Sequence, residues 1–336
     1  MPNIVCLGEA LVDMLSTAPG LNLVQTPEFH KAAGGAPTNV AAACSILGGS
    51  AGLIAQVGQD SFGEFLRQTL WDAGVDLTHF SVNKDYATQL AFVARDERGV
   101  PDFAFHVKKS ADQMLTIDEF EDDYIATADI FHFGSITLIN EPAKAATLHA
   151  LEVALDEGLL VSLDPNLRPP LWKSLDQAYD EIHGVVARCD FLKVSEQEMT
   201  FLTGHDDLEM GLRALYELGP ELVAVTLGPA GCAINSGGML LHLPAFRVPV
   251  LDTTGCGDAF VAATLVQLSE EERDIADLEA ADLEQIFRFS NATAALAATA
   301  EGAIPAMPTR EEVLELIELG GLKEEAEEEE DAEDLP

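Results

Sequence analysis

Residues Val250 to Phe260 read VLDTTGCGDAF, and the run AFVAATLVQL from Ala259 to Leu268 is apolar on nearly every side. Such a run predicts a helix that is buried all round, in the interior of a large fold. Gly255 and Gly257 stand just before it, where glycine lets backbone amides approach a ligand closely. The stretch therefore predicts a central helix whose N-terminus can hold an anion, for which a phosphate is the natural candidate.

Short apolar runs bounded by turn residues recur along the chain, with helical patterns between them. These runs are IVCLG (4–8), AGLIAQVG (51–58), IFHFGSI (130–136), LLVSLDPN (159–166), FLKVS (191–195) and ELVAVTLG (221–228). Strand and helix alternating in this way predict an α/β fold with a doubly wound, mostly parallel sheet flanked by helices. The stretch 231–244 predicts an antiparallel hairpin at the sheet edge, with its turn at Gly237 and Gly238.

Two stretches break the alternation, because they contain strand-like segments and turn residues but no helical pattern. They are residues 13–33 and 83–107, and we expect them to form one small β-sheet that acts as a lid. The α/β core is then assigned to residues 1–12, 34–82 and 108–320. The remaining residues, 321–336, are rich in glutamate and aspartate and are predicted to be a disordered acidic tail.

The charge balance of the 336-residue chain is strongly acidic, with 58 Asp and Glu against 18 Lys and Arg and a net charge of −40. Taking away the nine carboxylates of residues 324–336 still leaves −31. Such a surface repels nucleic acids and anionic membranes, so neither is expected as a partner. We interpret the acidity as an adaptation to a high-salt, halophilic cytoplasm, with a merely acidic protein as the alternative.

The sequence also predicts a reduced, cytoplasmic protein. No apolar run reaches membrane-spanning length, and the N-terminus lacks the pattern of a secretory signal. The five cysteines form no C-x-x-C pair and lie mostly in apolar stretches, so neither a disulfide framework nor a zinc site is expected.

Asp258 follows the glycines directly and is the first candidate for chemistry. Beside an anion hole it could accept a proton from a hydroxyl that attacks phosphorus, whereas in a plain turn it would only cap the helix. A carboxylate or thiol at a helix N-terminus is expected to have a lowered pKa, and this applies to Asp258 and to the Cys256 thiol.

Other polar residues follow predicted strands, where ligands of open α/β sheets bind. Asn39 lies in the first turn of a predicted helix after Gly34 and Gly35 and suits a polyol, although a capping role is an equal alternative. In SLDPNLRPPLW (162–172), Asp164, Asn166 and Arg168 alternate, and Arg168 offers a planar fork to oxygen atoms.

Three further features have ordinary alternatives. Glu196 and Glu198 suit a magnesium site or a solvated helix start, and Gly228 and Gly231 suit a nucleotide site or a turn. His132 is interpreted as a buried core residue. The sequence contains no G-x-x-x-x-G-K motif, which excludes a P-loop.

Taken together and in order, these segments resemble the ribokinase-like (PfkB) family of sugar kinases. Within the family the resemblance is closest to fructokinases, on GGAPTNVA, SADQML, FHFGSITL, DPNLRPPLW, KVSEQE, DTTGCGDAF and GAIPAMPT, and it runs from about Cys6 to Leu319. It implies a ribokinase-like α/β fold with a β-sheet lid, and a homodimer through the lid is a further expectation. It also implies ATP as phosphoryl donor, with Mg²⁺ and K⁺ as cofactors.

The resemblance also assigns roles to individual residues. It implies Asp258 as the catalytic base, with an anion hole formed by the amides of Gly255, Cys256 and Gly257. It implies that the sugar is bound by Asp13, Gly34, Gly35, Asn39 and Arg168, and that ATP is bound by Lys193, Thr226, Gly228, Gly231 and Asn291. It also implies that Glu198 lies near magnesium and that a monovalent cation is bound by Asp252 and Thr254.

The expected reaction is phosphorylation of the 6-hydroxyl of D-fructose by ATP, giving fructose 6-phosphate and ADP. Two alternatives remain open. One is a related kinase acting on ribose, 2-keto-3-deoxygluconate or a nucleoside, and the other is a non-catalytic sugar sensor that keeps the fold.

Overall fold

The computed structural model describes residues 1–18, 20–95, 101–107, 109–271 and 273–320. The predicted acidic tail, 321–336, lies outside the described residues. Within those residues, no helix combines the length and the apolar character needed to cross a membrane.

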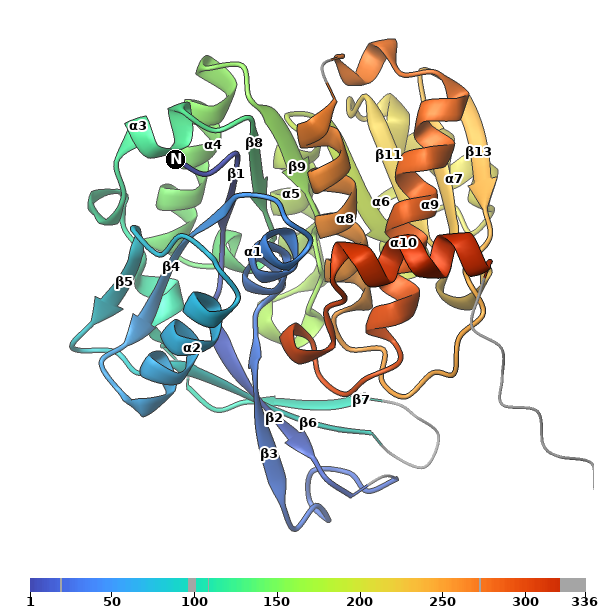
Figure 1. The fold of residues 1–336 in the computed structure, drawn as a ribbon. Helices are drawn as coiled ribbons and strands as arrows, with labels where there is room; N and C mark the ends of the chain where they lie inside the picture. The colour runs from blue at the N-terminus through green and yellow to red at the C-terminus, as the bar shows by residue number, and fades with distance from the viewer. Residues whose placement is uncertain (19, 96–100, 108, 272, 321–336) are drawn as a thin grey trace, which may run out of the picture.

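The largest sheet lies in the middle of the molecule (Figure 1). Over the described ranges, nine strands pair in the order β13-β12-β11-β10-β9-β8-β1-β4-β5. The strands are β1 (Ile4–Leu7), β4 (Ala51–Gly58), β5 (Phe80–Asn83), β8 (Ile130–Phe133), β9 (Leu160–Leu163), β10 (Phe191–Ser195), β11 (Leu222–Thr226), β12 (Cys232–Ser236) and β13 (Met239–Leu243). Pairing is parallel from β5 to β11, while β12 and β13 are antiparallel. The predicted mostly parallel sheet and its edge hairpin are confirmed.

Helices cover both faces of this sheet, because the connection between two parallel strands must pass over a face of the sheet to reach the end where the next strand begins. One face carries α1 (Ala36–Ile46), α2 (Ser61–Asp72), α8 (Cys256–Glu270), α9 (Ala280–Ala297) and α10 (Arg310–Leu319). The other carries α3 (Asp122–Ala126), α4 (Ala143–Asp156), α5 (Leu175–Val186), α6 (Glu196–Thr203) and α7 (Leu208–Glu217). The strand order reverses direction between β1 and β8, and such a switch point is where open α/β sheets bind ligands.

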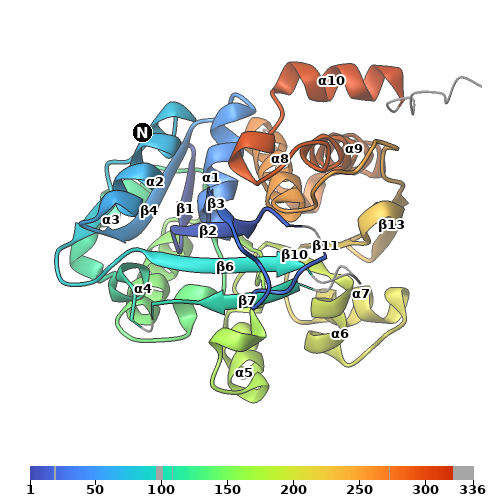
Figure 2. The ribbon, with the colours of Figure 1, turned by 90° about the horizontal axis from the view of Figure 1, so that it is seen from below.

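A second, smaller sheet lies below the main sheet in Figure 1, and Figure 2 shows it from that side. Its order is β3 (Phe29–Gly34), β2 (Leu11–Ser16), β6 (Gln89–Arg95) and β7 (Pro101–Phe105). β2 pairs with β6 in parallel, and the other two pairs are antiparallel. The strands of this sheet come from the two predicted insertions, but the observed bounds differ from the predicted ones. Leu11 and Gly34 pair within the small sheet, while Asn83 is the last residue of β5 in the main sheet. The division into core and lid remains a proposal.

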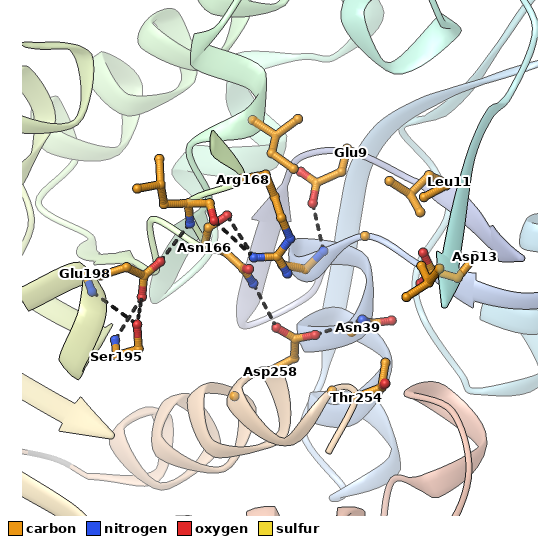
Figure 3. Close-up of a pocket in the computed structure, with 18 of the residues that line it drawn as sticks. Glu9, Leu11, Asp13, Asn39, Asn166, Arg168, Ser195, Glu198, Thr254 and Asp258 are labelled. Carbon is orange, nitrogen blue, oxygen red and sulfur yellow. Dashed lines mark hydrogen bonds between the residues drawn. The ribbon is translucent and has the colours of Figure 1, made fainter. Parts of the chain in front are cut away.

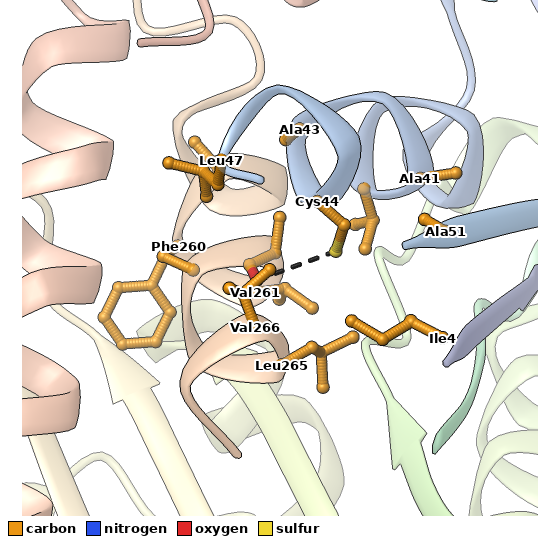
Figure 4. Close-up of a cluster of buried hydrophobic side chains, with 14 of the residues drawn as sticks. Ile4, Ala41, Ala43, Cys44, Leu47, Ala51, Phe260, Val261, Leu265 and Val266 are labelled. Carbon is orange, nitrogen blue, oxygen red and sulfur yellow. Dashed lines mark hydrogen bonds between the residues drawn. The ribbon is translucent and has the colours of Figure 1, made fainter. Parts of the chain in front are cut away.

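One cluster of buried hydrophobic side chains lies where α1 packs between α8 and the start of β1 (Figure 4). Leu265, Val266 and Phe260 of α8 are at most 1% exposed, which confirms the predicted all-round burial of this helix. Alanines such as Ala41 let α1 approach closely, and the Cys44 thiol lies 3.6 Å from the carbonyl oxygen of Ala262. This packing holds the first turns of α1 and α8 side by side.

Removal of the Leu265 side chain is predicted to destabilise the whole molecule. Leu265→Ala leaves a cavity in the α1–α8 core, which costs about 2–5 kcal/mol of unfolding free energy. The matched control is Leu314→Ala on α10, a leucine that is 48% exposed, for which a change within about 0.5 kcal/mol is expected. Urea denaturation measures both, and equal effects of the two substitutions would contradict the predicted core.

Candidate active site

A cavity of about 580 Å³ lies at the carboxyl ends of the central strands, between the main sheet and the small sheet. Segments distant in sequence reach it from both sheets and from the starts of α1, α6 and α8. The lining residues used below are Glu9, Asp13, Gly35, Asn39, Asn166, Leu167, Arg168, Lys193, Ser195, Glu198, Thr254, Gly255, Gly257 and Asp258. The site therefore forms where the strand order places a ligand crevice.

Asp258 occupies the first turn of α8 and is only 7% exposed. Asn39, in the first turn of α1, donates from Nδ2 to its Oδ2 over 2.8 Å (Figure 3). Asn166 donates from Nδ2 to its Oδ1 over 3.3 Å. The carboxylate is thus held from two sides, with its position in the cavity fixed by amides from two other segments.

Burial reverses the expected shift of the Asp258 pKa. The sequence predicts a lowered value at a helix N-terminus, but burial raises the pKa to about 7, with the Asp164 carboxylate adding to the rise. The Asn39 hydrogen bond and the charges of Lys193 and Arg168 oppose the rise without cancelling it. The prediction was wrong because loss of hydration outweighs the helix dipole, and a pKa near 7 suits a proton acceptor at neutral pH.

The N-terminus of α8 is open toward the cavity. Gly255 precedes the helix in a left-handed conformation (φ 79°), and no side chain caps the first turn. Unpaired amides at a helix start attract anions, so Gly255 and Gly257 present the predicted kind of anion site. A methyl group on Gly257 would come within 3.0 Å of the Lys193 Nζ atom, which places that amine directly behind the glycine.

Lys193 is a buried cation with a fixed partner. Its Nζ lies 2.8 Å from Oδ2 of Asp164. Burial alone would lower the pKa of Lys193, but the Asp164 and Glu198 carboxylates outweigh burial and raise it, so the amine stays charged. A fixed positive charge thus stands behind the anion site.

The Cys256 thiol departs from its prediction in the same way as Asp258. Burial raises its pKa to about 11, and the Asp252 and Asp258 carboxylates add to the rise. The predicted acidic thiol was therefore wrong, because burial outweighs the helix dipole. Cys256 is not among the residues that line the cavity, and its amide donates to Thr253 O over 3.4 Å, so its place in the anion site remains a prediction.

The predicted sugar-side residues are brought together around the other end of the cavity. Asp13, on β2, is partly buried, and loss of hydration raises its pKa to about 7 against the opposing charge of Arg168. A methyl group on Gly34 would lie 2.2 Å from Oδ2 of Asp13, so only glycine fits beside this carboxyl group. Arg168 forms no ion pair among the described residues, and its Nη1 bonds only its own loop, at 3.3 Å to Leu167 O and 3.4 Å to Asn166 O.

Glu198 is committed to local structure. Its Oε1 accepts from Leu167 N over 2.7 Å, and its Oε2 accepts from Ser195 N and Oγ, each over 2.8 Å. Direct coordination of a metal would cost these bonds, so the arrangement fits a magnesium ion held by phosphate oxygens and waters, with Glu198 behind them. Glu196 is exposed and does not line the cavity, which favours the solvated helix start for that residue.

The remaining predicted nucleotide-side residues do not line this cavity. Thr226 is the last residue of β11, Gly228 and Gly231 follow the strand, and Thr226 Oγ1 donates to Val194 O over 3.4 Å. Asn291, in α9, donates from Nδ2 to the carbonyl oxygens of Leu243 and Pro244, at 3.3 and 3.2 Å. Their nucleotide role remains a prediction.

Asp252, one of the two predicted monovalent-cation residues, accepts hydrogen bonds from the other, Thr254, and from Gly302. Asp252 Oδ1 accepts from Thr254 N and Oγ1, at 3.0 and 2.7 Å, and Oδ2 accepts from Gly302 N over 3.0 Å. Across the described residues, no group of three or more His, Cys, Asp or Glu side chains has a metal-binding arrangement. A cation here would depend largely on backbone oxygens, which suits a hard monovalent ion.

Glu9 was not among the predicted site residues, and Asn166 was named beside Arg168 but given no role. Glu9 follows β1 and is 2% exposed, and Asn166 has a positive φ of 45°. A carboxylate within the apolar start IVCLGEALV was an available signal for Glu9. For Asn166 the signal was its position after a buried strand, in the same segment as Arg168. His132 is the predicted core residue, since it is buried and its Nδ1 lies 2.9 Å from Ser162 Oγ.

Comparison with known proteins finds clear relatives. The model of the pfkB family of carbohydrate kinases matches residues 1–310. The chain is 42% identical over 297 residues to probable fructokinase-6, chloroplastic, from Arabidopsis thaliana, covering 88% of this chain and 77% of that protein. It is 42% identical over 294 residues to fructokinase-1 from Zea mays, covering 87% and 90%.

A similar solved structure is that of a fructokinase double mutant from Vibrio cholerae O395 in its fructose-, ADP- and potassium-bound form. Its TM-score is 0.84 at 33% identity, covering 94% of this chain and 98% of that one.

We predict that Asp258→Asn stabilises the protein at pH 8. The folded-state pKa of about 7 exceeds the value of 3.8 for an aspartate in water, so the folded protein binds more protons between these values and loses stability as pH rises. The amide removes this cost, so its Tm should exceed the wild-type Tm by a few degrees at pH 8, and the difference should shrink toward pH 4.

The matched control is Asp206→Asn, at an exposed carboxylate. Thermal melts at both pH values give the comparison. A lower Tm for Asp258→Asn at pH 8 would contradict the burial cost.

Proposed function

The chain belongs to the pfkB family of carbohydrate kinases, and from this premise we propose that it is an ATP-dependent fructokinase acting on the 6-hydroxyl of D-fructose. The observation that carries the proposal is the Asp258 carboxylate, oriented by Asn39 beside the open N-terminus of α8 inside one cavity. The fructokinase relatives at about 40% identity over most of the chain support the choice of sugar.

The proposed reaction uses the two ends of the cavity. The sugar lies among Asp13, Asn39 and Arg168, and its 6-hydroxyl faces Asp258. The hydroxyl oxygen attacks the γ-phosphorus of ATP, the bond to the β,γ-bridging oxygen breaks to release ADP, and the hydroxyl proton passes to Asp258.

The first-turn amides of α8 and the charge of Lys193 stabilise the moving phosphoryl group. Magnesium would neutralise charge on the ATP phosphates, with Glu198 behind its water shell, and potassium would brace the loop at Asp252 and Thr254.

The charges of the cavity favour a neutral sugar over an acidic one. Glu9, Asp13 and Asp258 present carboxyl groups, whereas the lining cations in the described part of the chain are Arg168 and Lys193, and Lys193 is paired with Asp164. An acidic substrate such as 2-keto-3-deoxygluconate would meet mainly like charge. Fructose carries no charge, and its hydroxyl groups suit hydrogen bonds with Asp13, Asn39 and Arg168.

Three further properties belong to the proposal. All five cysteines are free thiols, which suits a reducing cytoplasm. Strands β3 and β7 are the edges of the small sheet, and an edge strand can pair with a second copy, so a homodimer through the lid is proposed. The net charge of −40 supports a halophilic protein whose surface repulsion is screened by salt.

The test of the proposed function is a sugar panel with coupled detection of ADP, run at low and at molar KCl. Fructose is expected to give the highest kcat/KM among fructose, ribose, 2-keto-3-deoxygluconate and a nucleoside, and activity and Tm are expected to rise with KCl. A preference for another sugar would overturn the substrate, and ADP release from none would favour the sensor. A Tm that does not rise at molar KCl would overturn the halophilic assignment.

Asp258→Asn is predicted to lower kcat by about 10²–10⁴-fold, because the amide cannot take the proton. Fructose binding, measured by calorimetry, should change little, since Asn39 and Asp13 keep their positions. The base assignment fails if kcat stays near the wild-type value.

A further inference from the structure

The N-terminus of α1 cannot be capped by the residue that precedes the helix. Gly35 stands at that position with φ 105°, and a methyl group there would lie 2.2 Å from the carbonyl oxygen of Glu9. No serine, threonine or aspartate fits, although these residues normally satisfy the first amides of a helix. The first turn of α1 also contains no acidic residue to complement the helix dipole.

Glu9 supplies this cap from 27 residues earlier in the chain. Its Oε1 accepts from the amide of Ala36, the first residue of α1, over 2.8 Å. Its carbonyl oxygen accepts from Thr38 Oγ1 over 2.7 Å. Glu9 is 2% exposed, so these bonds are shielded from water.

The capped turn carries the side chain that orients the proposed base. Asn39 N donates to Gly35 O over 2.8 Å, and Asn39 Nδ2 donates to Asp258 Oδ2 over 2.8 Å. A contiguous set of bonds therefore runs from Glu9 through the first turn of α1 to Asp258. In Figure 3, Glu9 lies above Asn39 and Asp258, and a dashed line joins the side chains of Asn39 and Asp258.

We propose that Glu9 is a positioning residue, which fixes the start of α1 and thereby aims Asn39 at Asp258. The proposal rests on the proposed kinase function, because Asp258 is assigned there as the base. Because Glu9 follows β1, its bond to the Ala36 amide also links the start of α1 to the end of β1 at the switch point of the sheet. The carboxylate replaces a local cap that the Gly35 backbone forbids.

A direct contact between Glu9 and the sugar is the competing role. Glu9 lines the cavity, and its Oε2 has no hydrogen-bond partner among the described residues. A sugar contact would appear mainly in KM for fructose, whereas a loss of positioning would appear mainly in kcat. The two roles therefore differ in a measurable quantity.

The test compares Glu9→Gln with Glu9→Met in the full-length protein. Glutamine keeps an acceptor for the Ala36 amide, while methionine keeps the volume and removes the acceptor. Glu9→Met is expected to lower kcat about tenfold, and Glu9→Gln should retain most of the activity, because the loss follows the capping bond. The proposal is overturned if both variants change only KM, or if methionine and glutamine act alike.

A double-mutant cycle separates positioning from general destabilisation. If Glu9 acts through Asn39, then Glu9→Gln and Glu9→Met should have little further effect on kcat in an Asn39→Ala background. Undiminished effects in that background would overturn the proposal. Asp207→Ala removes a cap from α7, a helix that contributes no residue to the cavity lining, and should leave kcat and KM unchanged while testing the effect of losing a helix cap as such.

The outcome is distinguishable from failure of the proposed function. If the wild-type protein phosphorylates a sugar other than fructose, the same variants are compared on that sugar. The positioning of Asp258 is tested whichever hydroxyl it serves.

Discussion

The packing of α1 against α8 is the constraint on which the rest of the site depends. Both helices begin at the same end of the sheet, each after a glycine with a positive φ, and neither has a side-chain cap from its own preceding residue. Two helix starts therefore converge on one cavity: Glu9 accepts from the first amide of α1, and the start of α8 is the proposed phosphate site. The Asn39–Asp258 bond joins these two starts, so the packing of α1 against α8 determines the position of the proposed base.

The cavity holds carboxyl groups at a cost in stability. Burial raises the pKa values of Glu9, Asp13 and Asp258 to about 7, which means that their charged forms are less stable in the folded protein than in water. At neutral pH this opposes folding, and the apolar core around Leu265 and Phe260 must offset it. Proteins commonly retain such costly groups where chemistry requires them.

Local patterns predicted most of the fold, because strand and helix periodicity depend on neighbouring residues. The parallel sheet, the hairpin at Gly237 and Gly238, and the buried helix after Asp258 are of this kind. The pKa shifts of Asp258 and Cys256 were predicted with the wrong sign, because burial comes from segments distant in the sequence. Glu9 was missed for the same reason, since its cap is given to Ala36, which lies 27 residues away.

The acidic groups of this chain fall into two physical classes. The exposed carboxylates that dominate the net charge of −40 lie in water, where a Debye length of about 3 Å at 1 M salt screens their repulsion. Asp258 is 7% exposed and is held by neighbours at hydrogen-bonding distance, so dissolved ions screen it far less. Salt therefore acts on the surface that sets solubility and stability, while the pKa of the proposed base remains governed by burial.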